Sequence, residues 1–382
     1  MLASDALQAA GLQAVARTQG TSVENAQTKT EGVNVLKSPG QSYREPSIMV
    51  PEGEFPQQSL RIWPFDVPFS TRVNSERLRV SAHSRSWVQQ MGLCTTAAEL
   101  QRHDRYDMSL FACLNYPDAA GADLDLISDW VCWWSVWNDL TDRPEFLHDP
   151  DRVTRFFSSL AAVVELSERE IDEEMPAQDN RFVVAFSDIW RRWRRGMSAE
   201  FVSRTGRNWV NWFNSYIVEC HNRHAGASLD VDTYHQIRDF TGAVILELDA
   251  AERVGHYEVP PELLEIPPVR AMREITVRVI NITQDVQSLP KEEEAGDQHN
   301  LVLVLERRHS LTRMQALREV HVMIRRWTDG FLAEEASVPR FLDQFEVPLA
   351  RRRPVYKHID NMRTLMKGGV EFCAASGRYV KL

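Results

Sequence analysis

Apolar residues recur at intervals of three and four along most of the chain from Trp63 onward, and this spacing predicts α-helices. Stretches that alternate apolar and polar residues, as half-buried strands do, are not evident. Short clusters containing proline or glycine separate the helical stretches, and none resembles an interdomain linker. The predicted helices cover approximately residues 74–92, 96–114, 122–142, 151–170, 178–222, 230–256, 261–291, 299–331 and 355–376.

The N-terminal region has a different composition. Residues 1–57 are rich in Gln, Ser, Thr, Gly and Pro and contain few aromatic side chains. Such a segment cannot bury enough apolar surface to offset the entropy lost on folding. We therefore predict a disordered tail over 1–57, followed by one all-α domain, a helical bundle, over 58–382. The first twenty residues contain Asp5 and only Arg17 as a basic residue, which makes a poor signal or transit peptide.

The overall charge limits the classes of partner. The 382 residues include 44 Lys and Arg against 54 Asp and Glu, a formal net charge of −10. This excess of negative charge disfavours a general nucleic-acid binder and stable association with an anionic membrane. The five cysteines are dispersed without a CxxC pair, which fits a reducing compartment. We expect a soluble cytoplasmic protein.

The most informative stretch is residues 123–145, DLDLISDWVCWWSVWNDLTDRPE. Four tryptophans at i, i+3, i+4 and i+7 form one aromatic stripe on a helix, namely Trp130, Trp133, Trp134 and Trp137. The stripe runs directly into Asn138, Asp139 and Asp142, and two of these oxygen-bearing side chains, Asn138 and Asp142, share a face. This arrangement suits a hard divalent cation at the mouth of an apolar cavity. An ordinary core helix with a solvated acidic end is the alternative interpretation.

A second polar cluster lies within residues 280–302, INITQDVQSLPKEEEAGDQHNLV. Gln284, Ser288 and Glu292 stand at i, i+4 and i+8 and form one stripe of oxygen ligands. Oxygen ligands without His or Cys favour Mg²⁺ over zinc. Lys291 adds a cation that suits a phosphate oxygen. An exposed polar helix end is the alternative here.

Together the two clusters resemble the motifs of class I terpene synthases, in particular microbial sesquiterpene cyclases of the fungal type. That family carries an aspartate-rich DDxxD motif and a downstream NDxxSxxxKE motif, which match Asn138–Asp142 and Gln284–Glu292. Further matches are the pair Asp129-Trp130, the segment GDQHNLV from Gly296, the segment from Tyr234 that includes Arg238, and the C-terminal Arg378-Tyr379. The resemblance covers nearly everything after about residue 58.

The resemblance implies roles for particular residues. Three Mg²⁺ ions would be held by oxygen ligands from both motifs: Asn138, Asp139, Asp142, Gln284, Ser288 and Glu292. The catalytic groups that sense or bind diphosphate, or form a helix break beside it, would be Arg238, Lys291, Arg378, Tyr379, Thr241 and Gly242. The candidate aromatic wall of the substrate cavity comprises Trp63, Trp133, Trp134, Trp137, Phe240, Trp327 and Phe372, although core packing is the commoner role of such residues.

The chain departs from the family pattern at the first position of each motif. Asn138 replaces an aspartate, which removes one negative charge, and Gln284 replaces an asparagine, which lengthens the side chain by one methylene. We expect weaker Mg²⁺ binding. An alternative register would use Asn281 and Asp285 with Ser288 and Glu292, which also share a face. Pro290 removes a helix donor and should kink this turn.

These inferences predict a Mg²⁺-dependent sesquiterpene cyclase that ionises farnesyl diphosphate and releases diphosphate in isoprenoid biosynthesis. A prenyltransferase is one alternative, although it would be expected to carry a second aspartate-rich motif in place of QDVQSLPKE. A non-catalytic helical isoprenoid-binding protein descended from a cyclase is the other. The sequence leaves open whether the product is humulene-like or germacrene-like, and whether the protein forms a homodimer.

Overall fold

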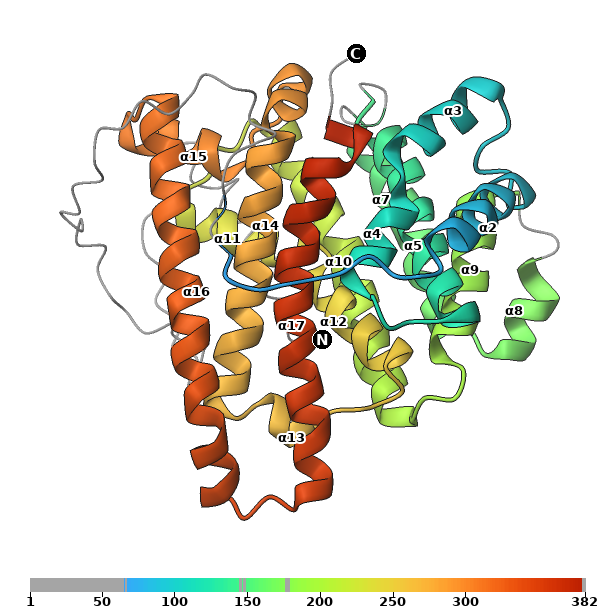
Figure 1. Cartoon of the computed structure of the whole chain (residues 1–382). Coiled ribbons are helices and arrows are strands. Elements are labelled where there is room, and N and C mark those ends of the chain that lie inside the picture. The colour runs from blue at the N-terminus through green and yellow to red at the C-terminus, as the bar shows by residue number, and fades with distance from the viewer. Residues whose placement is uncertain (1–64, 66, 144–145, 147–148, 176–178, 380–382) are drawn as a thin grey trace, which may run out of the picture.

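The computed structural model describes residues 65, 67–143, 146, 149–175 and 179–379. All regular secondary structure within these ranges is helical, which confirms the predicted all-α class (Figure 1). The predicted tail over 1–57 and the candidate wall residue Trp63 lie outside the described residues. No described helix combines the length and the apolar character needed to cross a membrane.

The principal helices follow one another along the chain with short connections. They are α2 (Arg77–Gln90), α3 (Ala97–Tyr106), α4 (Met108–Asn115), α5 (Gly121–Thr141), α7 (Pro150–Glu165), α8 (Glu168–Glu174), α9 (Arg181–Arg194), α10 (Ala199–His224), α11 (Val231–Thr241), α12 (Val244–Val254), α13 (Pro261–Leu264), α14 (Pro267–Ala295), α15 (Leu301–His309), α16 (Arg313–Gln344) and α17 (Leu349–Ala375), followed by a 3₁₀ turn, η3 (Gly377–Tyr379).

Local backbone geometry divides some of the predicted helices. The stretch predicted as 178–222 is split into α9 and α10 near Gly196, whose φ of +76° is incompatible with a right-handed helix. The stretch 96–114 is split at Asp107, which also has a positive φ. Conversely, the helix predicted to end near residue 331 is longer, because α16 passes through Pro339 and continues to Gln344. These boundaries depend on backbone conformation and packing, which periodicity does not show.

Side chains of the tryptophan stripe pack α5 against α9 and α10. Trp133 packs in a stacked arrangement against Phe186 of α9, with ring centroids 5.3 Å apart. Trp137 meets Trp212 and Tyr216 of α10 edge to face at 5.5 and 4.9 Å. Figure 1 shows α14, α16 and α17 side by side as the long orange and red helices, and α14 contacts both neighbours. The first predicted motif lies at the end of α5, and the second lies on α14.

Two glycine substitutions test this account of the helix ends. Gly196→Ala should lower the free energy of unfolding by about 1 kcal/mol, because an L-residue is strained at positive φ. Gly330→Ala lies inside α16, where the added Cβ would meet Ile275 at an ordinary 3.6 Å. It should raise that free energy by about 0.5–1 kcal/mol. Urea unfolding followed by circular dichroism measures the free energy of unfolding of both variants. Equal changes in the two variants would contradict the left-handed backbone conformation assigned to Gly196.

Candidate active site

Two adjoining cavities lie within the bundle. One, which we call the apolar cavity, encloses about 640 Å³ and is lined mainly by aliphatic and aromatic side chains. The other, the polar cavity, encloses about 1040 Å³ and is lined by many charged and hydrogen-bonding groups. Trp134, Gly242, Gln284 and Tyr379 line both cavities. The two spaces therefore meet at a boundary where charged and apolar surroundings are separated by a few side chains.

The last turns of α5 bring Asn138 and Asp142 to the polar cavity. The Asn138 amide donates from Nδ2 to Oδ1 of Asp142 over 3.1 Å, so the two side chains form one unit. Cations hold both of them: Arg378 Nη2 donates to Asn138 Oδ1 at 3.0 Å, and Lys291 Nζ donates to Asp142 Oδ2 at 2.8 Å. The first motif is thus linked directly to α14 and to η3.

Asp139 is placed apart from the other predicted ligands. It lines a neighbouring cavity rather than the polar cavity, because it lies one residue further around the helix. Arg378 and Lys291 reach its Oδ1 at 3.4 and 3.5 Å. Burial alone would raise the pKa of Asp139, but these positive charges outweigh it and lower the pKa below its ordinary value. Asp139 therefore stays charged and holds the two cations.

The second motif lies on one stripe of α14, with Gln284, Ser288 and Glu292 all lining the polar cavity. The Ser288 hydroxyl donates to the carbonyl of Gln284 at 2.9 Å, and Asn300 Nδ2 donates to Glu292 Oε2 at 2.7 Å. Burial and nearby carboxylates raise the pKa of Glu292. Pro290 lies inside α14, which continues to Ala295, and the kink expected at this residue stays a prediction.

The alternative register does not reach the cavity. Asp285 is 1% exposed, and its carboxylate accepts from the Tyr234 hydroxyl, from Arg238 Nε at 3.0 Å and from the backbone N–H of Leu301 at 2.7 Å. Asn281 donates to the carbonyl of Arg238 at 2.9 Å. Neither side chain lines the polar cavity. Both hold Arg238 of α11 in place instead, and this favours the register that begins at Gln284.

Four predicted diphosphate-binding groups line the polar cavity together: Arg238, Lys291, Arg378 and Tyr379. Arg238 Nη2 donates to Gln284 Oε1 at 3.0 Å, and Gln284 Nε2 donates to the Tyr379 hydroxyl at 3.4 Å. Burial tends to lower the pKa of Arg238, but Asp285 and other acidic neighbours raise it above its ordinary value. The arginine therefore remains a fixed positive charge in the polar cavity, bonded to Gln284 at the boundary of the two cavities.

The helix break expected at Gly242 is present between α11 and α12. Ala243 adopts a left-handed conformation with φ of +61°, and Thr241, whose carbonyl accepts from Trp212 Nε1 at 3.2 Å, ends α11. A Cβ on Gly242 would lie 1.7 Å from Oδ1 of Asn281. Only glycine permits this close approach, which brings the break against the α14 side chain that also holds the Arg238 carbonyl.

The aromatic wall is only partly as predicted. Trp134 and Phe372 line the apolar cavity. Trp133 and Trp137 line neither cavity and are fully buried in the aromatic core, where they pack against α9 and α10. Two others also lie outside both linings, Phe240 and Trp327, the latter packed against the His235 ring.

Other lining residues were missed from the sequence. In the apolar cavity these include Phe111, Ile280, Met366, Val370 and Glu247. On α17 the spacing by four and three residues places three lining side chains on one face, namely Met366, Val370 and Cys373. This helical periodicity could have predicted that they line the cavity together. Glu247 gave no such signal, because a single carboxylate in an amphipathic helix ordinarily faces solvent.

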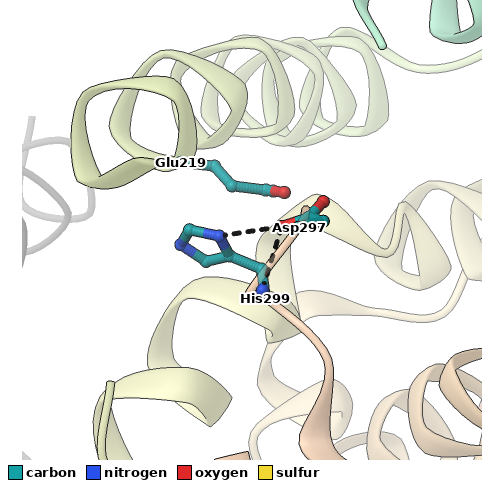
Figure 2. A group of neighbouring side chains, drawn as sticks. All are labelled: Glu219, Asp297 and His299. Atoms are coloured by element: carbon teal, nitrogen blue, oxygen red, sulfur yellow. Dashed lines mark hydrogen bonds and ion pairs between the residues drawn. The ribbon is translucent and has the colours of Figure 1, made fainter. Parts of the chain in front are cut away.

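A separate group of potential metal ligands lies at one edge of the polar cavity. Glu219 of α10 points toward Asp297, and the His299 ring lies beside it, with Nδ1 3.4 Å from Asp297 Oδ1 (Figure 2). However, the Arg223 guanidinium already bonds Glu219 and reaches Asp297 Oδ2 at 2.7 Å. Its positive charge balances these carboxylates, and the group fixes the connection between α14 and α15.

The comparisons with known proteins agree with this geometry. Residues 129–329 match the family described as terpene synthase family 2, C-terminal metal binding. This chain belongs to the terpene synthase family. It is 32% identical to pentalenene synthase of Streptomyces avermitilis over 317 residues, which cover 82% of this chain and 92% of the relative. Membership of a family defined by metal binding indicates that this terpene synthase uses a divalent metal.

Further relatives extend the comparison. Germacrene A synthase of Nostoc punctiforme is 24% identical over 82% of this chain and 94% of its own length. Among solved structures, a variant of cucumene synthase matches with a TM-score of 0.73 and 26% identity, over 83% of this chain and all of that chain. The two named source organisms are bacteria, so the expected fungal type is not supported.

The contact at Gly242 predicts the effect of one substitution. Gly242→Ala should displace the buried Asn281 side chain and lower stability by about 1–3 kcal/mol, as overpacking does. Because Asn281 also holds the Arg238 carbonyl, activity should fall more than the folded fraction does. Thermal denaturation and steady-state turnover of the same preparation measure the two effects. Wild-type stability with wild-type turnover would show that the close approach is not required.

Proposed function

We propose that this protein is a Mg²⁺-dependent sesquiterpene cyclase that converts farnesyl diphosphate into a cyclic sesquiterpene and diphosphate. The observation that carries the proposal is the joint placement of both oxygen-rich motifs and the basic groups around one polar cavity that adjoins an apolar one. The names of two relatives support the sesquiterpene class, since one makes pentalenene and another is described as cyclising (2E,6E)-farnesyl diphosphate. We also propose one catalytic domain over 58–382, because buried apolar residues from Phe65 to Cys373 form one core.

The residues fit a cluster of Mg²⁺ ions. Five of the six predicted ligands line the polar cavity, and all offer oxygen, which Mg²⁺ prefers: Asn138, Asp142, Gln284, Ser288 and Glu292. We assign these five to the metal, three ions in all. Asp139 is better suited to hold Lys291 and Arg378 in place. When bound, Mg²⁺ would offset the negative charge that develops on the leaving diphosphate.

The chain's own cations act on the same group. Arg238, Lys291 and Arg378 approach the polar cavity from α11, α14 and η3, so they surround a diphosphate from three directions. Tyr379 adds a hydroxyl at the boundary. Preformed positive charge of this kind stabilises the charge separation as the C–O bond breaks. The guanidinium of Arg378 also lies 5.1 Å from the centre of the Trp134 ring, which fixes that indole between the two cavities.

The apolar cavity receives the hydrocarbon chain. Its lining of Trp134, Phe111, Phe372 and aliphatic side chains excludes water, which would otherwise trap a carbocation as an alcohol. The faces of aromatic rings stabilise positive charge. The shape of this cavity sets the folding of the substrate chain and therefore the first ring closure.

The prenyltransferase alternative is tested by one incubation. The protein is mixed with farnesyl diphosphate and Mg²⁺, with and without isopentenyl diphosphate, and volatile products and released diphosphate are measured. We expect a cyclic sesquiterpene in both cases. Chain elongation without a cyclic product would establish the prenyltransferase, and no diphosphate release at saturating Mg²⁺ would establish the non-catalytic binding protein.

Removal of single ligands tests the metal assignment. Asp142→Ala and Glu292→Ala should each reduce turnover by at least about a hundredfold, because each removes an anionic ligand that stabilises the transition state through the metal. The matched control is Glu293→Ala, whose carboxylate pairs with Arg313 at the surface. It should retain turnover close to that of the wild type. If Asp142→Ala and Glu292→Ala both keep full turnover with folded protein, the assignment is wrong.

The unusual asparagine in the first motif provides a further prediction. Asn138→Asp should lower the Mg²⁺ concentration for half-maximal activity by roughly three- to tenfold, because affinity rises with the number of charged ligands. Without Mg²⁺ the same variant should be less stable than the wild type, since repulsion between two carboxylates would replace the hydrogen bond of 3.1 Å between Asn138 and Asp142. Asn138→Ala should raise the Mg²⁺ requirement. Unaltered requirements in both variants would exclude Asn138 as a ligand.

A further inference from the structure

One carboxyl group in the interior has no part in the reaction described so far. Glu247 lies in the first turn of α12, is 7% exposed and lines the apolar cavity but not the polar one. Within the described ranges, we find no hydrogen bond or ion pair to its carboxyl oxygens. A buried polar side chain that lacks a partner is costly, so its presence in this cavity calls for a chemical explanation.

The surroundings keep this group protonated. Burial, with no opposing charge, raises the pKa of Glu247 to about 8. Three further groups in this region are also neutral: burial raises the pKa of Cys373, which lines the same cavity, to about 12, and burial likewise raises those of Tyr116 and Tyr379. Tyr116 donates to the backbone carbonyl of Glu247 at 3.0 Å, which fixes the start of α12. At neutral pH Glu247 is thus the strongest acid that faces the apolar cavity.

An acid in this position matches a particular need of carbocation chemistry. A cyclic cation that loses a proton becomes a neutral olefin, and no further ring forms until a new cation is generated. Thr283 cannot supply that proton, since its hydroxyl is a far weaker acid and donates to the carbonyl of Val279 at 2.6 Å. The carboxyl of Glu247 can, and it lies in the cavity that would hold the olefin.

We propose that Glu247 is a catalytic residue that protonates a neutral cyclic olefin bound in the apolar cavity and so starts a second cyclisation. This inference rests on the proposed cyclase function. In the first stage, the initial cation gives a proton to the released diphosphate and becomes the olefin. The O–H bond of Glu247 then breaks, the π electrons of one double bond form the new C–H bond, and the adjacent carbon becomes cationic.

The last stage restores the starting enzyme. After the second ring closure, a C–H bond beside the cationic carbon breaks, and its electrons form the double bond of the product. The proton passes to the Glu247 carboxylate, which becomes a carboxyl group again. The second stage is therefore an isomerisation of the olefin, with no change in its composition and no additional reactant.

The test uses the full chain in D2O with Mg²⁺, with enzyme in excess over farnesyl diphosphate so that each active site turns over once. The carboxyl proton exchanges with solvent beforehand, so the wild-type product should gain one deuterium. Glu247→Gln keeps the shape of the side chain but has no acidic proton. It should release diphosphate at a rate within about threefold of the wild type and yield an unlabelled olefin with fewer rings.

Two further variants separate proton donation from a structural effect. Glu247→Asp keeps the acid and should recover part of the deuterium uptake. Glu252→Gln alters a buried carboxyl on the same helix that lines neither cavity and that pairs with Arg204 at 2.8 Å. It should lower stability but keep the wild-type product and its label.

Three outcomes would overturn the inference. Diphosphate release with an unlabelled wild-type product would reject it and leave the cyclase function standing. The same labelled product from Glu247→Gln would show that another group donates the proton. No diphosphate release by the wild type would overturn the proposed function as well. Mass spectrometry of the volatile products, with diphosphate measured in the same samples, distinguishes these cases.

Discussion

The candidate active site depends on partly or fully buried arginines whose positions are fixed by acidic and amide partners. Arg238 is bonded to Asp285, Arg223 to Asp297 and Glu219, and Arg378 to Asp139 and Asn138. Removing each guanidinium from water costs several kcal/mol, and only charged or hydrogen-bonded partners offset that cost. The paired acids therefore hold positive charge next to an apolar cavity that would not otherwise tolerate it. The same ion pairs join four helices and η3 around the polar cavity.

A single helix provides both environments. On α14, Ile280 and Thr283 line the apolar cavity, whereas Ser288 and Glu292 line the polar one, and Gln284 lines both. The lining of the cavities thus changes from apolar to charged side chains along this one helix. This explains why the second motif could be predicted from the sequence. Its side chains share one stripe of the helix, and helical periodicity alone brings them together.

Other parts of the site could not be predicted in the same way. The spacing of the tryptophans established a helix with an aromatic stripe, but Trp133 and Trp134 point in different directions, and only packing against α9 and α10 decides which faces the cavity. Positive φ angles at Asp107 and Gly196 divide helices that look continuous in the sequence. Helix boundaries and cavity linings depend on tertiary contacts, whereas the motifs depend on local spacing.

The contacts that Arg378 and its neighbour Ser376 make with much earlier residues matter for folding during synthesis. Its guanidinium contacts Asn138, 240 positions earlier, and the nearby Ser376 hydroxyl bonds the carbonyl of Tyr106, 270 positions earlier. During synthesis, the helices that carry the first motif leave the ribosome long before these residues exist. A growing chain therefore has Asn138 and Asp139 without their guanidinium partner, and the α5 end of the polar cavity is completed only when η3 has docked.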